Sequence, residues 1–245
     1  MTSVLIISSV WVEPKSSAAG QRMLQLINFF KSLSYQINYQ STAQLSENRF
    51  DLTKIDVTEE IIELNNVSFD IRLKEINPDI VIYDRFIVEE QFGWRVTENC
   101  PTAFTILDTE DLHSLRKSRQ LAIKQKTAFN IDFWKNQEVT LREIASIYRC
   151  DLSLIISEVE MKHLLGAFNI PEYLLYYLPI LVEEESLTND SPDFAQRKNF
   201  VTIGNFLHEP NWDSVQWLKK EIWPLIRKKI PKAELHIYGA YAAQK

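Results

Sequence analysis

Short apolar runs alternate with amphipathic stretches along the chain. Continuous apolar runs, typical of parallel strands covered on both faces, predict strands at residues 3–9, 79–83, 102–107 and 152–156. Apolar positions at helical spacing predict helices at residues 21–33, 61–76 and 135–149, and an alternating segment at 35–39 predicts one more strand. Because strands that alternate with helices indicate βαβ crossovers, we expect an α/β fold with a mostly parallel, Rossmann-like sheet.

The same order of elements begins again near the C-terminus. Residues 200–217, FVTIGNFLHEPNWDSVQW, are expected to form a strand ending at Gly204, a short loop, and a helix beginning at Pro210. This is the opening βα unit of a nucleotide-binding domain. The acidic, polar segment before it has no apolar periodicity and is predicted to be a linker.

These boundaries divide the chain into a first domain at 1–182, a linker at 183–198 and the first βαβ unit of a second Rossmann-like domain at 199–245. A complete doubly wound half needs roughly a hundred residues or more. We therefore expect the second domain to be incomplete.

Composition and charge narrow the class of protein. With 45% hydrophobic and 24% charged residues, the chain is typical of a soluble globular protein. A net charge of −6, with neither sign collected in a long block, argues against general nucleic-acid binding.

Cys100 and Cys150 lack metal-ligand spacing and are interpreted as structural thiols in a reducing compartment. The N-terminal apolar run lacks a signal-peptide pattern and is too short to span a membrane, so we expect a cytoplasmic protein without a transmembrane segment.

The segment LDTEDLHSLRKSR, at residues 107–119, concentrates reactive side chains just after a predicted strand. Ligands bind at this edge of open parallel sheets, which favours an active site there. Asp111 and His113 are candidates for proton transfer or for contacts with sugar hydroxyls, and Arg116 is a candidate for holding a phosphate or carboxylate. The alternative is a solvated helix start, with acids in the first turn and bases later.

Two other segments are predicted to reach the same edge of the sheet. Small residues in the loop at 13–20, including Ala19 and Gly20, would let a phosphate approach the backbone, but a tight turn explains them equally well. The loop has neither the P-loop pattern nor GxGxxG. Asp84 and Arg85 end a strand and either orient a substrate or pair with each other.

The chain has no GxSxG elbow, no zinc-protease or kinase motif, and no histidine pair at metal-ligand spacing. The absence of a nucleophile motif favours group transfer by positioning and electrostatics over covalent catalysis. Neither a metal nor a cofactor is expected.

Two segments resemble a known family. Residues 140–164, TLREIASIYRCDLSLIISEVEMKHL, resemble a stretch of retaining GT-B glycosyltransferases of the family-four-like group of sugar transferases. Residues 200–239, from FVTIGNFLHEPNWDSVQW to ELHIYG, are similar to the opening of the C-terminal domain in that family. The first strand and the loop ending at Ala19–Gly20 match more loosely.

This resemblance implies two Rossmann-like domains with a cleft between them, the acceptor held mainly by the first and the nucleotide-sugar by the second. By position, Ala19 and Gly20 would lie near the donor phosphates, His113 near the transferred sugar, and Gly204 where the second domain approaches the donor. The family retains anomeric configuration without a protein nucleophile, and the nucleotide-sugar is a substrate rather than a cofactor.

The chain also departs from the family pattern. One glycine of the usual pair in the first loop is Ala19, and LHEPN replaces the basic residues that often follow the GNF-like strand. The acidic E-x7-E donor motif would lie beyond Gly239 and outside this chain. We therefore expect the chain alone to bind and turn over donor weakly or not at all.

The leading hypothesis is a glycosyltransferase, or a fragment of one, that moves a sugar from a nucleotide-sugar to a glycan, lipid or small-molecule acceptor with retention. One alternative is a non-catalytic, transferase-like binding or scaffold chain. Another is one half of a split enzyme whose separate partner chain supplies the rest of the donor domain. A Rossmann oxidoreductase is disfavoured because GxGxxG is absent.

Overall fold

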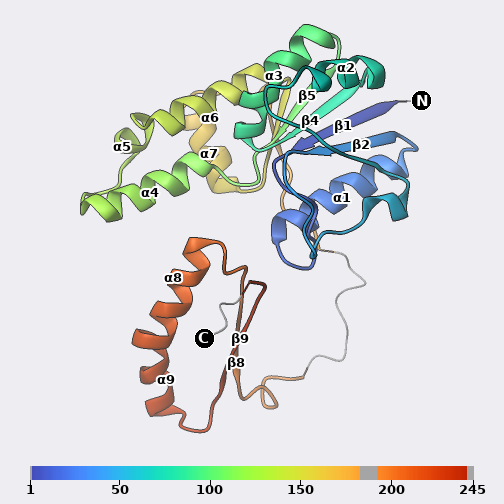
Figure 1. The fold of residues 1–245 in the computed structure, drawn as a ribbon. Helices are drawn as coiled ribbons and strands as arrows, with labels where there is room; N and C mark the ends of the chain where they lie inside the picture. The colour runs from blue at the N-terminus through green and yellow to red at the C-terminus, as the bar shows by residue number, and fades with distance from the viewer. Residues whose placement is uncertain (1, 183–191, 242–245) are drawn as a thin grey trace.

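The computed structural model describes residues 2–182 and 192–241. Its main sheet has seven parallel strands in the order β3-β2-β1-β4-β5-β6-β7 (Figure 1). The strands are β1 (Ser3–Ser8), β2 (Gln36–Ser41), β3 (Thr58–Ile61), β4 (Ile80–Asp84), β5 (Phe104–Asp108), β6 (Leu152–Ile155) and β7 (Leu175–Tyr177). The predicted α/β class and parallel, Rossmann-like sheet are confirmed.

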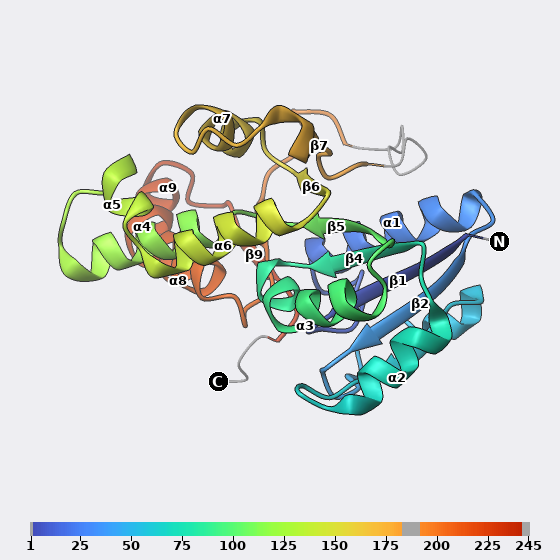
Figure 2. The same ribbon diagram turned by 90° about the horizontal axis from the view of Figure 1, so that it is seen from above.

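Helices cover both faces of this sheet (Figures 1 and 2). They are α1 (Ala18–Ser32), α2 (Val67–Ile76), α3 (Phe86–Asn99), α4 (His113–Gln125), α5 (Ile131–Lys135), α6 (Glu138–Arg149) and α7 (Glu158–Gly166), with short 3-10 turns η1 (Leu52–Ile55) and η2 (Glu172–Leu174). Side chains of β1 alternate between two cores. Val4 and Ile6 pack with α1, whereas Leu5 and Ile7 pack with the cluster that contains α2 and α3.

Local chemistry explains where the sequence prediction was wrong. Helix α1 begins three residues earlier than predicted, because Ser17 caps it by accepting a hydrogen bond from the Gly20 amide at 3.0 Å. Helix α2 begins at Val67 rather than at residue 61, because Asn66 caps it and the residues before it form β3 and a turn. Helix α3 was not predicted, because its buried face includes the charged Glu89 and Arg95, which interrupt the apolar pattern.

The second unit consists of β8 (Phe200–Ile203) and β9 (Leu235–Tyr238), which pair in parallel, and the helical run between them. That run is α8 (Glu209–Trp217), the π-helical η4 (Leu218–Ile222) and α9 (Trp223–Lys229). The predicted strand, loop and helix at 200–217 are therefore present, and Pro210 lies in the first turn of α8, where its missing N–H costs nothing.

Residues 183–191 of the predicted linker lie outside the described residues, so the domain boundaries stay a prediction. Among the helices in residues 2–182 and 192–241, none is long and apolar enough to cross a lipid bilayer.

The strand order creates a crevice at one edge of the main sheet. Strands β1 and β4 are neighbours, but the chain leaves β1 toward α1 and leaves β4 toward α3, which cover opposite faces (Figure 2). Such a topological switch point is where open α/β sheets bind ligands. The loops after β8 and β9 reach this crevice: Asn205 Nδ2 donates to the Ser16 carbonyl at 3.3 Å, and the Tyr241 hydroxyl donates to Glu13 Oε2 at 3.0 Å.

Candidate functional site

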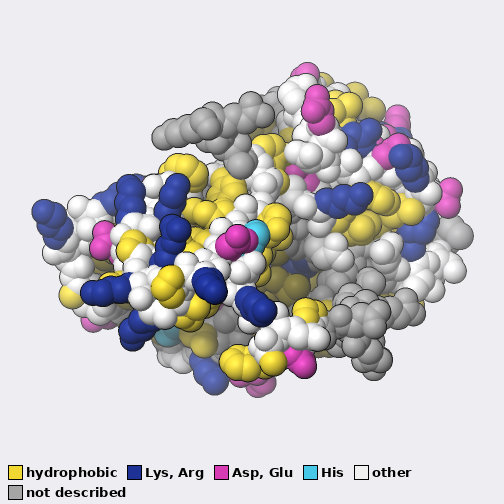
Figure 3. Space-filling view, turned by 90° about the horizontal axis from the view of Figure 1, so that it is seen from below, with side chains coloured by type: hydrophobic (Ala, Val, Ile, Leu, Met, Phe, Trp, Pro, Cys, Tyr) yellow, Lys and Arg dark blue, Asp and Glu magenta, His cyan; other side chains and the backbone are white. Residues whose placement is uncertain are grey.

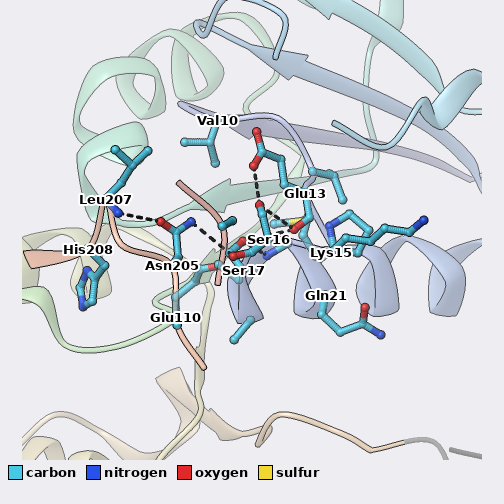
Figure 4. Close-up of a pocket in the computed structure, with 18 of the residues that line it drawn as sticks. Val10, Glu13, Lys15, Ser16, Ser17, Gln21, Glu110, Asn205, Leu207 and His208 are labelled. Atoms are coloured by element: carbon cyan, nitrogen blue, oxygen red, sulfur yellow. Dashed lines mark hydrogen bonds between the residues drawn. The ribbon is translucent and has the colours of Figure 1, made fainter. Parts of the chain in front are cut away.

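A cleft of about 1050 Å³ lies between the carboxyl edge of the main sheet and the second unit. Its walls are the loop after β1, the ends of β4 and β5, and the loops after β8 and β9. In Figure 4, Asn205 points to the β1–α1 loop and a dashed line joins its amide to Ser16, and Figure 3 shows a face of the molecule hollowed near its centre. All the predicted site residues line this cleft: Ala19, Gly20, Asp84, Arg85, Asp111, His113, Arg116 and Gly204.

The first loop brings backbone amides to the cleft. Ala19 and Gly20 belong to the first turn of α1 rather than to the loop, and the Gly20 N–H is taken by the Ser17 hydroxyl. Within the described part of the chain, no protein group accepts from the Ala18 and Ala19 N–H groups. These two amides, rather than that of Gly20, are thus the donors at this helix N-terminus that an anion could use.

We expect Gly20→Ala to destabilise the protein by about 1–3 kcal/mol, as for other overpacked sites. A Cβ at this position would overlap with the backbone of Glu13, which lies in the turn that the glycine closes. Urea denaturation measures the effect. Gly166→Ala is the matched control, since no atom lies within 4 Å of its Cβ position and alanine is the better helix former. Equal stability of the Gly20 variant and wild type would contradict the prediction.

Arg85 and Glu110 form an ion pair at the switch point. Arg85 donates to Glu110 Oε2 from Nη2 at 2.6 Å and from Nε at 2.9 Å. Its contact with Asp84 is longer, at 3.6 Å, so the pairing expected between adjacent Asp84 and Arg85 is only secondary. Both Arg85 (φ 76°) and Glu110 (φ 58°) have left-handed backbone conformations, which few residues adopt. Backbone strain of this kind concentrates at functional sites.

Asp84 is buried beside this pair. Its Oδ2 accepts a hydrogen bond from the Ser8 hydroxyl at 2.5 Å, while its Oδ1 has no hydrogen-bond partner among residues 2–182 and 192–241. A buried acceptor without a hydrogen bond is costly, and the Arg85 Nε at 3.6 Å offsets part of that cost as an ion contact.

Burial and the negative charge of Asp84 raise the pKa of Glu110 from 4.5 to about 7, with Arg85 opposing the shift. Between pH 4.5 and 7 the folded state holds a proton at Glu110 that the unfolded state has lost, so this group makes stability fall as pH rises. We therefore expect the stability of Glu110→Gln relative to wild type to rise across this interval. Denaturation at a series of pH values tests this, with the exposed Glu98→Gln as control; parallel curves for wild type and Glu110→Gln would contradict it.

Asp111, His113 and Arg116 form a polar cluster at the start of α4. Asp111 Oδ1 lies 3.1 Å from His113 Nε2, and Asp111 Oδ2 accepts from Arg116 Nε at 2.7 Å. Burial acts to raise the pKa of Asp111, but the hydrogen bonds from His113 and Arg116 outweigh it and hold that pKa well below its usual range. The ionised Asp111 therefore orients the imidazole, whose side chain is 12% exposed and packs edge-on against Phe86. A held imidazole beside a cleft can bind or move a proton at a ligand hydroxyl.

The opposite wall contributes residues that sequence reasoning missed. His208 is the N-cap of α8, lines the cleft and has its pKa lowered by burial and by the charge of Arg116. Asn205 bridges the two units, and its carbonyl accepts from Asn211 Nδ2 at 3.1 Å. The available signal was the LHEPN segment, which places a histidine and the start of a helix where basic residues were expected.

Within the described residues, no group of three or more His, Cys, Asp or Glu side chains is arranged to hold a metal ion. No protein-family model and no curated protein sequence matches the chain.

Comparison with solved structures identifies the fold. Over 98% of this chain and 62% of the other, the structure matches the apo form of a lipopolysaccharide outer core galactosyltransferase, WaaB, with a TM-score of 0.53 and 14% identity. The chain has the GT-B fold. It spans about three fifths of the length of that galactosyltransferase, so the likeness concerns the fold alone.

Weaker matches follow. A glycotransferase of kitacinnamycin gives a TM-score of 0.48 with 12% identity over 100% of this chain and 67% of the other. An alpha-glucosyltransferase in complex with UDP and DNA gives 0.49 with 11% identity over 98% and 68%. The assignment of the GT-B fold rests on the match to the galactosyltransferase and not on these two.

Proposed function

We propose that the chain comprises the acceptor-side domain and the beginning of the donor domain of a glycosyltransferase that uses a nucleotide-sugar. The observation that carries the proposal is the cleft at the β1/β4 switch point, with His113, Asp111 and Arg116 on one wall and the N-terminus of α8 on the other. The GT-B fold supports it. The nucleotide-sugar, the acceptor and the roles of individual residues belong to the proposal.

The donor pyrophosphate would lie between two helix N-termini. The Ala18 and Ala19 amides at the start of α1 supply hydrogen-bond donors on one side. The N-terminus of α8, with His208, supplies a positive field on the other. Arg116 adds a fixed charge nearby, because it lines the same cleft as His208. This arrangement suits a diphosphate better than a neutral ligand.

The transferred sugar would then face His113 and the carboxylates of the main sheet. His113, oriented by Asp111, is placed to hydrogen-bond a sugar hydroxyl. Asp84 Oδ1, which has an ion contact with Arg85 but no hydrogen bond among the described residues, would accept from another hydroxyl. For retention, the acceptor oxygen forms a bond to the anomeric carbon on the face from which the phosphate leaves. The bond from that carbon to the phosphate oxygen breaks, and the acceptor proton passes to the leaving phosphate. No protein nucleophile takes part in this sequence.

Calorimetric titration of the chain with a panel of UDP-, GDP- and ADP-sugars tests the proposal, with donor hydrolysis followed in parallel. Because the E-x7-E motif would lie outside this chain, the expected result is weak binding to one nucleotide that Arg116→Met reduces further and Arg119→Met does not. Arg119 is a matched control because it lies on the same helix but does not line the cleft. Its guanidinium lies over the Phe129 ring instead, 5.5 Å from the centroid. No binding to any nucleotide-sugar by folded protein would argue against a usable donor site.

A second candidate is a chain that acts with a separate partner. It is favoured by the exposed apolar side chains of β8, where Val201 is 68% and Ile203 81% exposed. Apolar strands left open in this way favour association with another chain. Light scattering of the pure protein, and of the protein mixed with a candidate donor-domain chain, would detect such a complex; a monomer under both conditions would argue against it.

We also propose a reducing, cytoplasmic setting. Cys100 and Cys150 are both free and buried, which supports this location. Cell fractionation tests it, and recovery of the protein outside the cytoplasm would contradict it.

A further inference from the structure

The first turn of α4, which carries His113, is held by carboxylates from two other helices. Its N-cap residue is Leu112, whose side chain makes no cap hydrogen bond. The N–H groups at this helix start, which an ordinary serine or aspartate cap would satisfy, need other acceptors. Glu143 of α6 and Glu160 of α7 provide them.

Glu143 uses both carboxylate oxygens on this turn. Its Oε1 accepts from the His113 N–H and its Oε2 accepts from the Ser114 N–H, each at 2.9 Å. The side chain is buried, with 1% of the residue exposed. The Ser114 hydroxyl accepts from Trp134 Nε1 at 2.9 Å, so the residue whose N–H binds Glu143 is also tied to α5 through its side chain. A negative charge at this helix terminus is favourable, which offsets part of the cost of burying it.

Glu160 completes the arrangement from α7. Its Oε1 accepts from the Leu112 N–H at 3.1 Å. The sequence pattern Ser157-x-x-Glu160 indicates a capping box on α7, and Ser157 does accept from the Glu160 amide at 3.4 Å. The carboxylate, however, is turned to α4 instead of closing the box.

Glu143 and Glu160 both lie in the segment 140–164, which we singled out in the sequence but to which the proposed function assigns no role. Together they bind three consecutive amides, those of residues 112–114. A local cap would stabilise α4 by itself. Acceptors from α6 and α7 instead fix the start of α4 relative to the rest of the domain.

We propose that Glu143 and Glu160 are positioning residues for His113. By binding its own N–H and those of its two neighbours, they set the backbone from which the imidazole reaches Asp111 at 3.1 Å and faces the cleft. The importance of this positioning for sugar transfer rests on the proposed function. The claim that the two glutamates position His113 is independent of that function.

The experiment uses Glu143→Gln and Glu160→Gln, which keep the side-chain size. A glutamine offers one acceptor oxygen, so Glu143→Gln leaves one of two buried amides facing an NH₂ group. Amide hydrogen exchange at His113 and Ser114 should become about tenfold faster or more, as expected for the loss of a buried hydrogen bond. Glu160→Gln keeps one acceptor oxygen for the single N–H that Glu160 binds, that of Leu112. Its effect on amide exchange should therefore be smaller than that of Glu143→Gln and centred on Leu112. Glu138→Gln, on the exposed face of α6, is the control and should change neither.

The decisive readout is the NMR signal of the His113 imidazole, one of four histidines in the chain. We expect Glu143→Gln to move this signal, while the signal of His236 on β9 stays in place. Faster exchange with an unmoved His113 imidazole would mean that Glu143 only caps the helix, and would overturn the proposal. Unchanged exchange would overturn it as well.

This design separates the proposal from the proposed function. If wild type binds no nucleotide-sugar but Glu143→Gln shifts the His113 signal, the positioning role stands and the function fails. If donor is turned over, Glu143→Gln should lower kcat with little change in KM, and Glu138→Gln should change neither. Equal kcat in Glu143→Gln and wild type, together with a shifted His113 signal, would show that turnover does not depend on the position of His113 and would overturn the part of the proposal that concerns sugar transfer.

Discussion

Replacing Arg22 with methionine should destabilise the fold by about 3–5 kcal/mol, because it leaves a buried carboxylate without its partner. Arg22 Nε lies 3.0 and 3.1 Å from the two carboxylate oxygens of Asp108, and the two side chains are 4% and 0% exposed. Arg22 also donates from Nη1 to the Leu178 carbonyl at 2.8 Å. The pair therefore joins α1, the end of β5 and the segment after β7. Urea denaturation of the purified variant measures the loss.

Two further variants make the result specific. Arg72→Met removes a partly exposed pair with Glu60, whose side chains are 37% and 26% exposed, and should cost less than about 1 kcal/mol. The double variant Arg22→Met/Asp108→Leu removes both buried charges and should be more stable than Arg22→Met alone. A loss below 1 kcal/mol for Arg22→Met would show that Asp108 is solvated or protonated in the folded protein.

Replacing His113 with alanine should lower kcat/KM for sugar transfer or donor hydrolysis by about 10²–10³-fold, the range measured when a positioned acid, base or hydrogen-bond donor is removed. The imidazole lines the cleft and is oriented by Asp111 at 3.1 Å. Its loss would also leave Asp111 with Arg116 as its remaining partner. Steady-state kinetics with the donor found by titration measures the effect, and calorimetry shows whether donor binding falls with it.

The control for this prediction is His236→Ala. His236 lies on β9, its side chain is 40% exposed and it takes no part in the cleft. The control should keep its activity and its circular dichroism spectrum. If His113→Ala retained kcat/KM within about threefold of wild type, His113 would be a structural residue beside Phe86 and the assignment of the reacting sugar to this wall would be wrong.

Much of the site could be predicted from the sequence because ligand sites in parallel sheets follow the ends of strands. Asp84, Arg85, Asp111 and His113 each follow a run of apolar residues that forms a strand, and all line the cleft. The roles assigned to them stay predictions. Glu110 was visible in the same segment, but its pairing with Arg85 was not, since the two residues follow different strands, β5 and β4.

Residues held by long-range contacts were missed. Glu143 looked like one of several charged positions on an amphipathic helix, because nothing local shows that it meets the amides of His113 and Ser114 thirty and twenty-nine residues away. The loop after β8 was predicted as part of a nucleotide-binding βα unit, but its contact with the first domain was not. Its Asn205 contacts Ser16 only after the two units come together.

The sequence by itself determined most of the elements of this protein and their order, because hydrophobic periodicity, capping residues and prolines act over a few neighbouring positions. It thereby determined the α/β class, the parallel sheet and most of the residues that reach its carboxyl edge. The tertiary structure alone decided which buried charges pair, which amides stay free for a ligand, and which glutamates hold His113. Those choices depend on the strand order β2-β1-β4-β5 and on packing between segments far apart in the chain, where no local pattern specifies the partner.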